Sequence, residues 1–195
     1  MKKRKISLPF SLGVCLILCG LCLLLVSQLR THIGLRNSRE ILLRLSEILP
    51  EKTPGVPGVY FSSGMPVLEI GGIDYAAVLE VPAFGVAVPV ADQWDSGRLS
   101  LSPARFSGSV YDQTLIIGGA DLAWQLAFCD KIEHGTVIIV TDMTGTQFTY
   151  TVSGIYRARH AEAQWLMDAD CDLTLFCHDR YSMEYIAVRC TFAYL

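Results

Sequence analysis

DLTLFCHDRYSMEYIAVRC, residues Asp172–Cys190, carries the clearest strand patterns of the chain. Apolar alternation and β-branched residues predict one strand over residues 172–176 and a second over residues 185–192. Cys177 and His178 follow the first strand, and Arg189 lies within the second. A thiol, an imidazole and a guanidinium are the groups of a cysteine-based active site, so this stretch raises the question whether they meet in space.

The chain on the N-terminal side of this stretch shows the same strand pattern. Met143–Gly145 predicts a hairpin turn, and residues 123–132 predict one short helix with Asp121 as its N-cap. Many short strands with one or two short helices predict a mainly β fold, a closed barrel of about seven to eight strands. The further predicted strands cover residues 75–81, 86–90, 111–117, 136–141 and 147–156.

The N-terminus predicts a membrane anchor. Residues 1–5 read MKKRK, and Pro9–Ser27 contains no charged residue. Such a run is near the lower end of the roughly 17–25 residues that span a bilayer. A cleaved signal peptide is the alternative, but no Ala-x-Ala cleavage site follows the run. The basic tip is expected in the cytoplasm, so residues 1–27 predict a single-pass cell-membrane protein with an extracytoplasmic C-terminal domain.

A second helical pattern follows the apolar run. Gln28–Leu49 places leucine and isoleucine at helical spacing with charges between them, which predicts an amphipathic stalk helix. The stalk could pack on its own domain, or serve as a lid or a lipid-surface contact. Prolines and glycines between residues 50 and 58 predict a linker. The expected domains are therefore 1–27, 28–58 and 59–195.

Charge and cysteine content limit the function classes. Beyond Pro50 the chain has eight Lys/Arg against seventeen Asp/Glu, an acidic balance that argues against nucleic-acid partners. No metal-ligand spacing and no phosphate-binding loop is present, so no metal or cofactor is expected. Four cysteines in this part could stay free or form two disulfides, with three possible connectivities: Cys129, Cys171, Cys177 and Cys190.

Four segments carry further motifs. The first, YAAVLEVPAFGVAVPV (75–90), has an opening strand ending in Pro-Val, and the second, residues 98–119, has a Gly-Ser before a strand ending in glycine. The third, residues 126–152, has a Gly-Thr-Val strand with a Thr-Asp turn, and the fourth is DLTLFCHDRYSMEYIAVRC. In this order the segments resemble sortases, the membrane-anchored cysteine transpeptidases of Gram-positive bacteria, and the fourth resembles the strand pair that carries the family's cysteine and arginine.

The resemblance implies a closed barrel and a defined chemistry. In sortases a cysteine thiolate attacks a sorting signal such as Leu-Pro-x-Thr-Gly, a histidine transfers protons, and an arginine stabilises the oxyanion. The implied partners are a sorting-signal peptide and the surface or pilin protein that carries it. The implied activity anchors surface proteins to the cell wall or builds pili.

Placed residue by residue, the family's catalytic positions are substituted in this chain. The histidine is expected after an Ile-x-Gly, which here leads to Gly119. Without a gap, the cysteine position falls on His178 and the arginine position on Tyr185. This alignment predicts a catalytically impaired sortase homologue that binds sorting-signal-type peptides or a protein partner.

A one-residue deletion would place Cys177 in the nucleophile position instead. A shift by one residue reverses the side chain's face, so the strand end would have to bulge or turn. Arg189 or Arg180 and His160 or His178 would then support an active, atypical cysteine transpeptidase or hydrolase. A third interpretation is a structural membrane protein that assembles through its stalk helix. The oligomeric state stays open.

Overall fold

A computed structural model describes residues 8–58, 64–159, 163–167, 170–179 and 182–194. Within these residues, ten strands and four helices follow one another. In order they are α1 (Leu8–Ile48), β1 (Thr53–Pro54), β2 (Leu68–Ile70), β3 (Ile73–Val81), the 3₁₀ helix η1 (Pro82–Phe84), β4 (Val86–Ala91), β5 (Ala104–Ser107), β6 (Leu115–Ala120), the 3₁₀ helix η2 (Ala127–Asp130), β7 (Val137–Asp142), β8 (Thr146–Ala158), α2 (Ala163–Met167), β9 (Leu173–His178) and β10 (Tyr185–Phe192).

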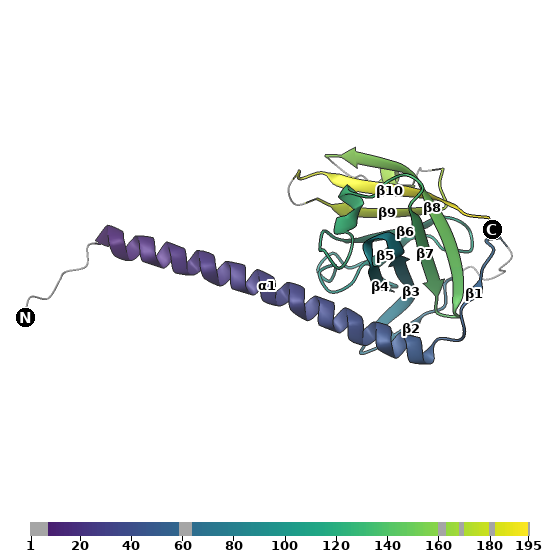
Figure 1. The fold of residues 1–195 in the computed structure, drawn as a ribbon, viewed down its shortest axis with the longest axis horizontal. Helices are drawn as coiled ribbons and strands as arrows, with labels where there is room; N and C mark the ends of the chain where they lie inside the picture. The colour runs from purple at the N-terminus through teal and green to yellow at the C-terminus, as the bar shows by residue number, and fades with distance from the viewer. Residues whose placement is uncertain (1–7, 59–63, 160–162, 168–169, 180–181, 195) are drawn as a thin grey trace, which may run out of the picture.

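Eight of the strands form a closed barrel (Figure 1). The order β8-β10-β9-β6-β5-β4-β3 continues through β7, which pairs with both β3 and β8 and so closes the ring. β6 and β9 are parallel, whereas β9 and β10 are antiparallel neighbours. The expected mainly β fold with a closed barrel is therefore confirmed, and β9 and β10 carry the stretch Asp172–Cys190.

The barrel interior is filled by alternate residues of its strands. Leu79, Ile117, Val140, Leu175 and Val188 are among the interior side chains, and all of them are fully buried. Their alternation with residues of the outer face follows the period of two along a strand. This alternation determines which side chains of β6, β9 and β10 can meet.

The hairpin at Met143–Gly145 is confirmed. The Asp142 carboxylate is buried and accepts hydrogen bonds from the Thr144 amide at 2.8 Å and the Thr146 amide at 3.0 Å. The Tyr111 hydroxyl donates to the same carboxylate at 2.7 Å. Gly145 has a φ of +84°, a conformation that suits glycine. Asp142 therefore satisfies the turn and joins it to the loop before β6.

Several sequence-based expectations differ from the structure. The helix predicted over residues 123–132 is only the 3₁₀ helix η2, and its N-cap is Leu126 rather than Asp121. The strand predicted over 111–117 begins at Leu115, because Tyr111 turns inward to Asp142. The short strands β1, β2 and β5 and the helix α2 were not predicted, since segments of two to five residues carry almost no periodic signal.

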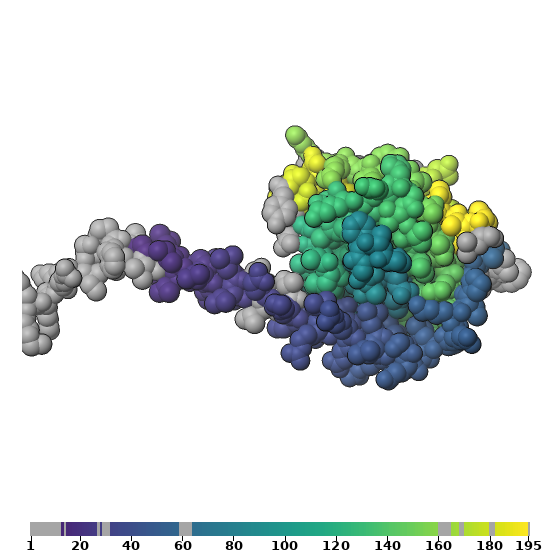
Figure 2. All heavy atoms as spheres, in the orientation of Figure 1, coloured from purple at the N-terminus to yellow at the C-terminus, as the bar shows by residue number. Residues whose placement is uncertain are grey.

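The uncharged run Pro9–Ser27 and the predicted stalk belong to one helix, α1, which continues through the expected boundary at residue 27. The C-terminal part of α1 packs on the barrel, where Ser38 and Leu45 are buried and a Cβ at Gly34 would meet the Trp124 ring at 2.6 Å. The N-terminal part extends away from the barrel (Figures 1 and 2). Among the described residues, no helix combines the length and the apolarity needed to cross a membrane.

Candidate functional site

Two rows of paired residues cross β6, β9 and β10 at one end of these strands. In the first row, Gly119 pairs with Cys177, and Cys177 with Ile186. In the second row, Ala120 pairs with His178, and His178 with Tyr185. Side chains in one row share a face of the sheet, and the two rows face opposite ways. Each expected site residue at these strand ends therefore points either into the barrel interior or to its outer face.

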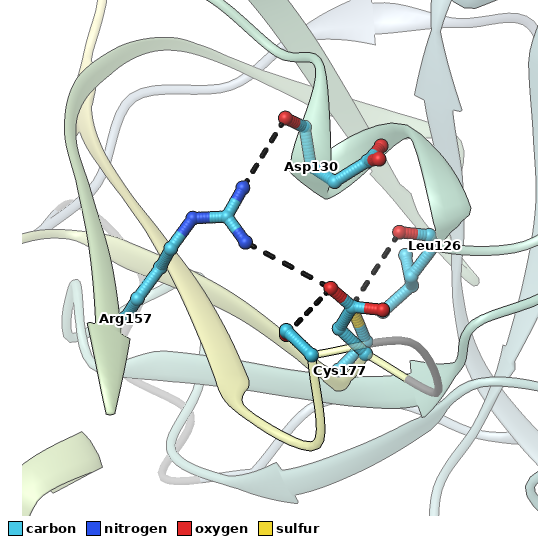
Figure 3. A network of polar contacts seen from close by, with 6 residues as sticks. Leu126, Asp130, Arg157 and Cys177 are labelled. Atoms are coloured by element: carbon cyan, nitrogen blue, oxygen red, sulfur yellow. Dashed lines mark hydrogen bonds and ion pairs between the residues drawn. The ribbon is translucent and has the colours of Figure 1, made fainter. Parts of the chain in front are cut away.

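Cys177 belongs to the interior face. It lies in the core cluster with Leu175 and Ile186, and only 2% of its surface is exposed. Its thiol donates to the carbonyl oxygen of Leu126 at 3.6 Å (Figure 3). The register of β9 runs evenly from Leu173 to His178 against both neighbours. The bulge that would turn Cys177 outward is thus not formed.

Gly119 also belongs to the interior face, where its missing side chain leaves room for a neighbour. A Cβ there would meet Leu126 Cδ1 at 2.8 Å and Pro103 Cβ at 3.1 Å. A histidine at this position would have to displace that packing. The row that contains His178 and Tyr185 runs through Ala120 rather than Gly119. The outer row therefore presents a methyl group, an imidazole and a phenol.

His178 and Tyr185 contact each other on the outer face. Their rings meet edge to face with centroids 4.8 Å apart, and both side chains are half-buried. Aromatic pairs in this geometry add about 0.5–1.5 kcal/mol to the free energy of unfolding. The two residues that occupy the expected cysteine and arginine positions thus form a packing contact.

Arg189 of β10 lies on the outer face, beside the end of β9 that is farther from His178. It pairs with Thr174 in the register, and its guanidinium stacks over the Tyr156 ring at 4.3 Å. It also donates to the Trp165 carbonyl of α2 at 3.3 Å, while its Nε is buried without a hydrogen-bond partner among the described residues. Arg189 therefore ties α2 to β8 and β10, away from Cys177.

His160 and Arg180, the other expected supporting residues, lie outside the described residues. Of the described candidates, the structure brings together only His178 and Tyr185. Cys177 faces the core, Arg189 lies at the far end of the strands, and Gly119 is packed against Leu126. No thiol, imidazole and guanidinium converge among these residues.

The outer face carries an aromatic cluster that sequence reasoning missed. Trp94 from the loop before β5 and Phe106 of β5 pack on Phe176, with ring centroids between 5.1 and 5.5 Å apart. Leu166 of α2 is buried against the same cluster, and Trp165 lies beside it. The one sequence signal is Gly118, since a Cβ there would meet the Trp94 ring at 2.3 Å.

A cavity of about 210 Å³ opens beside Cys177. Arg157 connects the segments around it, donating to the Asp130 carbonyl at 3.4 Å and lying 3.9 Å from an Asp179 carboxylate oxygen (Figure 3). The exposed Arg157 makes this a weak ion pair. The charged residues that line the cavity are three acids and one base, Asp121, Asp130, Asp179 and Lys131.

The fold is that of the sortases. No family model and no curated protein matches the chain. Among solved structures, sortase A from Corynebacterium diphtheriae is similar, with a TM-score of 0.54, 18% identity, and 63% of this chain and 62% of that chain covered.

Two further solved structures are similar over the same barrel. A Clostridium perfringens sortase C determined with the C-terminal cell wall sorting motif has a TM-score of 0.53 and 20% identity, covering 63% of this chain and 72% of that chain. Sortase A from Listeria monocytogenes has a TM-score of 0.53 and 14% identity, covering 62% of this chain and 88% of that chain. The resemblance drawn from the four sequence segments therefore holds for the fold.

Proposed function

We propose that this protein is a catalytically impaired, membrane-anchored sortase homologue that binds a sorting-signal-type peptide or a protein that carries one. The observation behind the proposal is the outer row of the barrel, where Ala120, His178 and Tyr185 stand side by side. The resemblance assigns the nucleophile to His178 and the arginine to Tyr185. An imidazole cannot form the thioester, and a phenol carries no cation for the oxyanion.

The surroundings of Cys177 also argue against catalysis. A reactive cysteine needs a thiolate, and a thiolate needs a positive neighbour and access to substrate. Cys177 is buried and its thiol donates to the Leu126 carbonyl, so a substrate has little access to its sulfur. The charged residues that line the cavity beside it are three acids and only one base, Lys131.

Peptide binding needs no catalyst. An extended peptide can pair its backbone with a strand while side-chain pockets select its residues. The outer face offers the half-buried rings of Trp94, Trp165 and Tyr185 for apolar side chains. A Clostridium perfringens sortase C was solved with a sorting motif, which makes this ligand class the first to test.

Membrane anchoring is part of the proposal. Pro9–Ser27 is uncharged, and the described part of α1 exposes Leu16, Ile17, Leu21 and Leu24 to solvent. Apolar side chains exposed in such density have a higher free energy in water than in lipid, so this segment favours the membrane. With the basic residues 2–5 in the cytoplasm, the barrel would lie outside the cell membrane.

An active cysteine enzyme is the second candidate, and one observation favours it. Cys177 lines the 210 Å³ cavity together with Asp179 and Lys131, so a small rotation of the strand end would expose its sulfur. This candidate predicts cleavage of sorting-signal peptides that disappears in Cys177→Ala and persists in Cys171→Ala.

The experiment measures both properties on the full chain in detergent. Fluorescence-quenched and fluorescein-labelled Leu-Pro-x-Thr-Gly peptides report cleavage and binding. The proposal expects binding without cleavage, a weaker affinity in Tyr185→Ala, and an unchanged affinity in Cys177→Ala and in the exposed control Tyr194→Ala. No binding to any sorting-signal peptide would refute it, and cleavage that depends on Cys177 would favour the second candidate.

A further inference from the structure

Two cysteines from distant parts of the chain converge on one carbonyl oxygen. The backbone amide of Cys129 in η2 donates to the Leu126 oxygen at 3.0 Å. The thiol of Cys177 in β9 donates to the same oxygen at 3.6 Å (Figure 3). A shared acceptor places the two cysteines next to each other at the end of the barrel, although they are far apart in the sequence.

Both thiols are buried in the same core cluster. Cys129 is 0% and Cys177 2% exposed. The pKa of the Cys129 thiol is raised well above its ordinary value, first by the hydrogen bond with the Cys177 side chain and then by burial. The contact between the two side chains is thus the main influence on Cys129.

One of the two buried thiols borders a cavity. Cys177 is among the residues that line the cavity of about 210 Å³, and Cys129 is not. The volume suits a small reagent, and the three lining acids, Asp121, Asp130 and Asp179, outnumber the two nearby bases, Lys131 and the Arg157 that pairs with Asp179. A small cation is therefore drawn toward Cys177, and a small anion is repelled.

We propose that Cys129 and Cys177 are a redox-sensitive pair that a small-molecule disulfide oxidises to an intramolecular disulfide. Cys177 as thiolate attacks the reagent, forms a mixed disulfide and releases one small thiol. Cys129 as thiolate then attacks the Cys177 sulfur and releases the second. The pair loses two electrons and two protons in total, and the reagent is reduced to two thiols.

The remaining cysteines of the barrel domain have other partners. Cys171 lies 3.2 Å from the Thr174 hydroxyl, and Cys190 donates to the Val188 carbonyl at 3.9 Å. Cys190 pairs with Leu173 in the register, four residues along β9 from Cys177, which is about 13 Å at the usual rise per residue. Of the three connectivities that the sequence allows, only the one with a Cys129–Cys177 bond is compatible with this arrangement.

The disulfide would lock η2 onto β9 and remove the Cys177 thiol. This inference does not rest on the proposed peptide binding, because it concerns the core of the barrel rather than its outer row. Its failure would leave the binding proposal intact, and the reverse also holds.

The experiment uses the reduced full-length chain in detergent at neutral pH. It is exposed to cystamine, a cationic disulfide, or to oxidised glutathione, an anionic one, and is then denatured, alkylated with N-ethylmaleimide and digested. Mass spectrometry is expected to find the Cys129 and Cys177 peptides joined and their alkylation lost. Cystamine is expected to react several-fold faster than glutathione at low salt, and the difference should shrink at high salt.

Matched variants separate the steps. Cys129→Ala, or Cys129→Ser if the first variant does not fold, should stop at a mixed disulfide on Cys177. Cys171→Ala and Cys190→Ala should still form the Cys129–Cys177 bond. The proposal is overturned if both thiols remain alkylated after cystamine, if the wild type retains the mixed disulfide, or if Cys177 pairs with Cys190.

Discussion

Cys177 and His178 are neighbours in the chain, yet they face opposite sides of β9. Cys177 lies among the core residues and pairs with Gly119 and Ile186, whereas His178 pairs with Ala120 and contacts Tyr185. The period of two along a strand keeps the thiol and the imidazole apart. A cysteine one residue further along would lie in the outer row, where the resemblance to sortases places the nucleophile.

The first prediction concerns thiol reactivity. In the folded chain, Cys177 should react with a neutral maleimide at least about tenfold more slowly than the half-buried Cys171, because burial limits access to its sulfur. Quantitative mass spectrometry of labelled peptides measures both rates in one sample. Equal rates would show that the strand end opens readily.

Gly118 should tolerate no side chain. A Cβ in Gly118→Ala would meet the Trp94 ring at 2.3 Å and the Phe176 ring at 2.5 Å, so the aromatic cluster must shift. We expect the free energy of unfolding to fall by about 1–3 kcal/mol in urea titrations. Gly64→Ala is the control, since among the described residues no atom beyond its chain neighbours lies within 4 Å of a Cβ at this position.

Asp142 should be among the most sensitive polar residues of the barrel. Its carboxylate accepts bonds from the Tyr111 hydroxyl and from the Thr144 and Thr146 groups in a fully buried site. The amide of Asp142→Asn can accept fewer of them, so unfolding should become easier by about 2–3 kcal/mol. The exposed Asp112→Asn should change the urea midpoint little, and a similar loss in both variants would count against this account.

Arg189 should stabilise α2 on the barrel. Arg189→Lys keeps the charge but loses the planar group that stacks on Tyr156 and reaches the Trp165 carbonyl. A loss of about 1 kcal/mol corresponds to roughly fivefold faster hydrogen exchange in residues 163–167. Amides of β7 should exchange at an unchanged rate; a uniform increase would indicate general destabilisation instead.

Alkaline pH should destabilise the fold, in part through Cys129. The pKa of this thiol is raised in the folded state, first by the hydrogen bond with Cys177 and then by burial. The unfolded chain therefore ionises first, so stability is complete below the ordinary thiol pKa of 9.0 and falls as the pH rises above it. Urea midpoints at neutral and alkaline pH should show a smaller decline in Cys129→Ala than in Cys171→Ala, and equal declines would contradict the assignment.

The order of the four sortase-like segments was sufficient to predict the barrel. Alternation is clearest in β8, which buries one face and needs apolar residues at every second position, whereas β3, β7 and β10 also bury runs of consecutive residues. The aromatic cover of Trp94, Phe106 and Trp165 could not be predicted, since Trp94 lies in a loop and the other two lie in elements of four and five residues, which are too short to show a sequence period.

The sequence by itself determined the strand pattern, the absence of an arginine at Tyr185 and two candidate positions for the Cys177 sulfur: the family's nucleophile position, or one residue before it. Only the tertiary structure decided between those positions. Hydrogen bonding of β9 to β6 and β10 sets one register, and that register turns Cys177 into the core beside Cys129. The sequence lists the order of residues along a strand, but the face to which each side chain points depends on the register with the neighbouring strands.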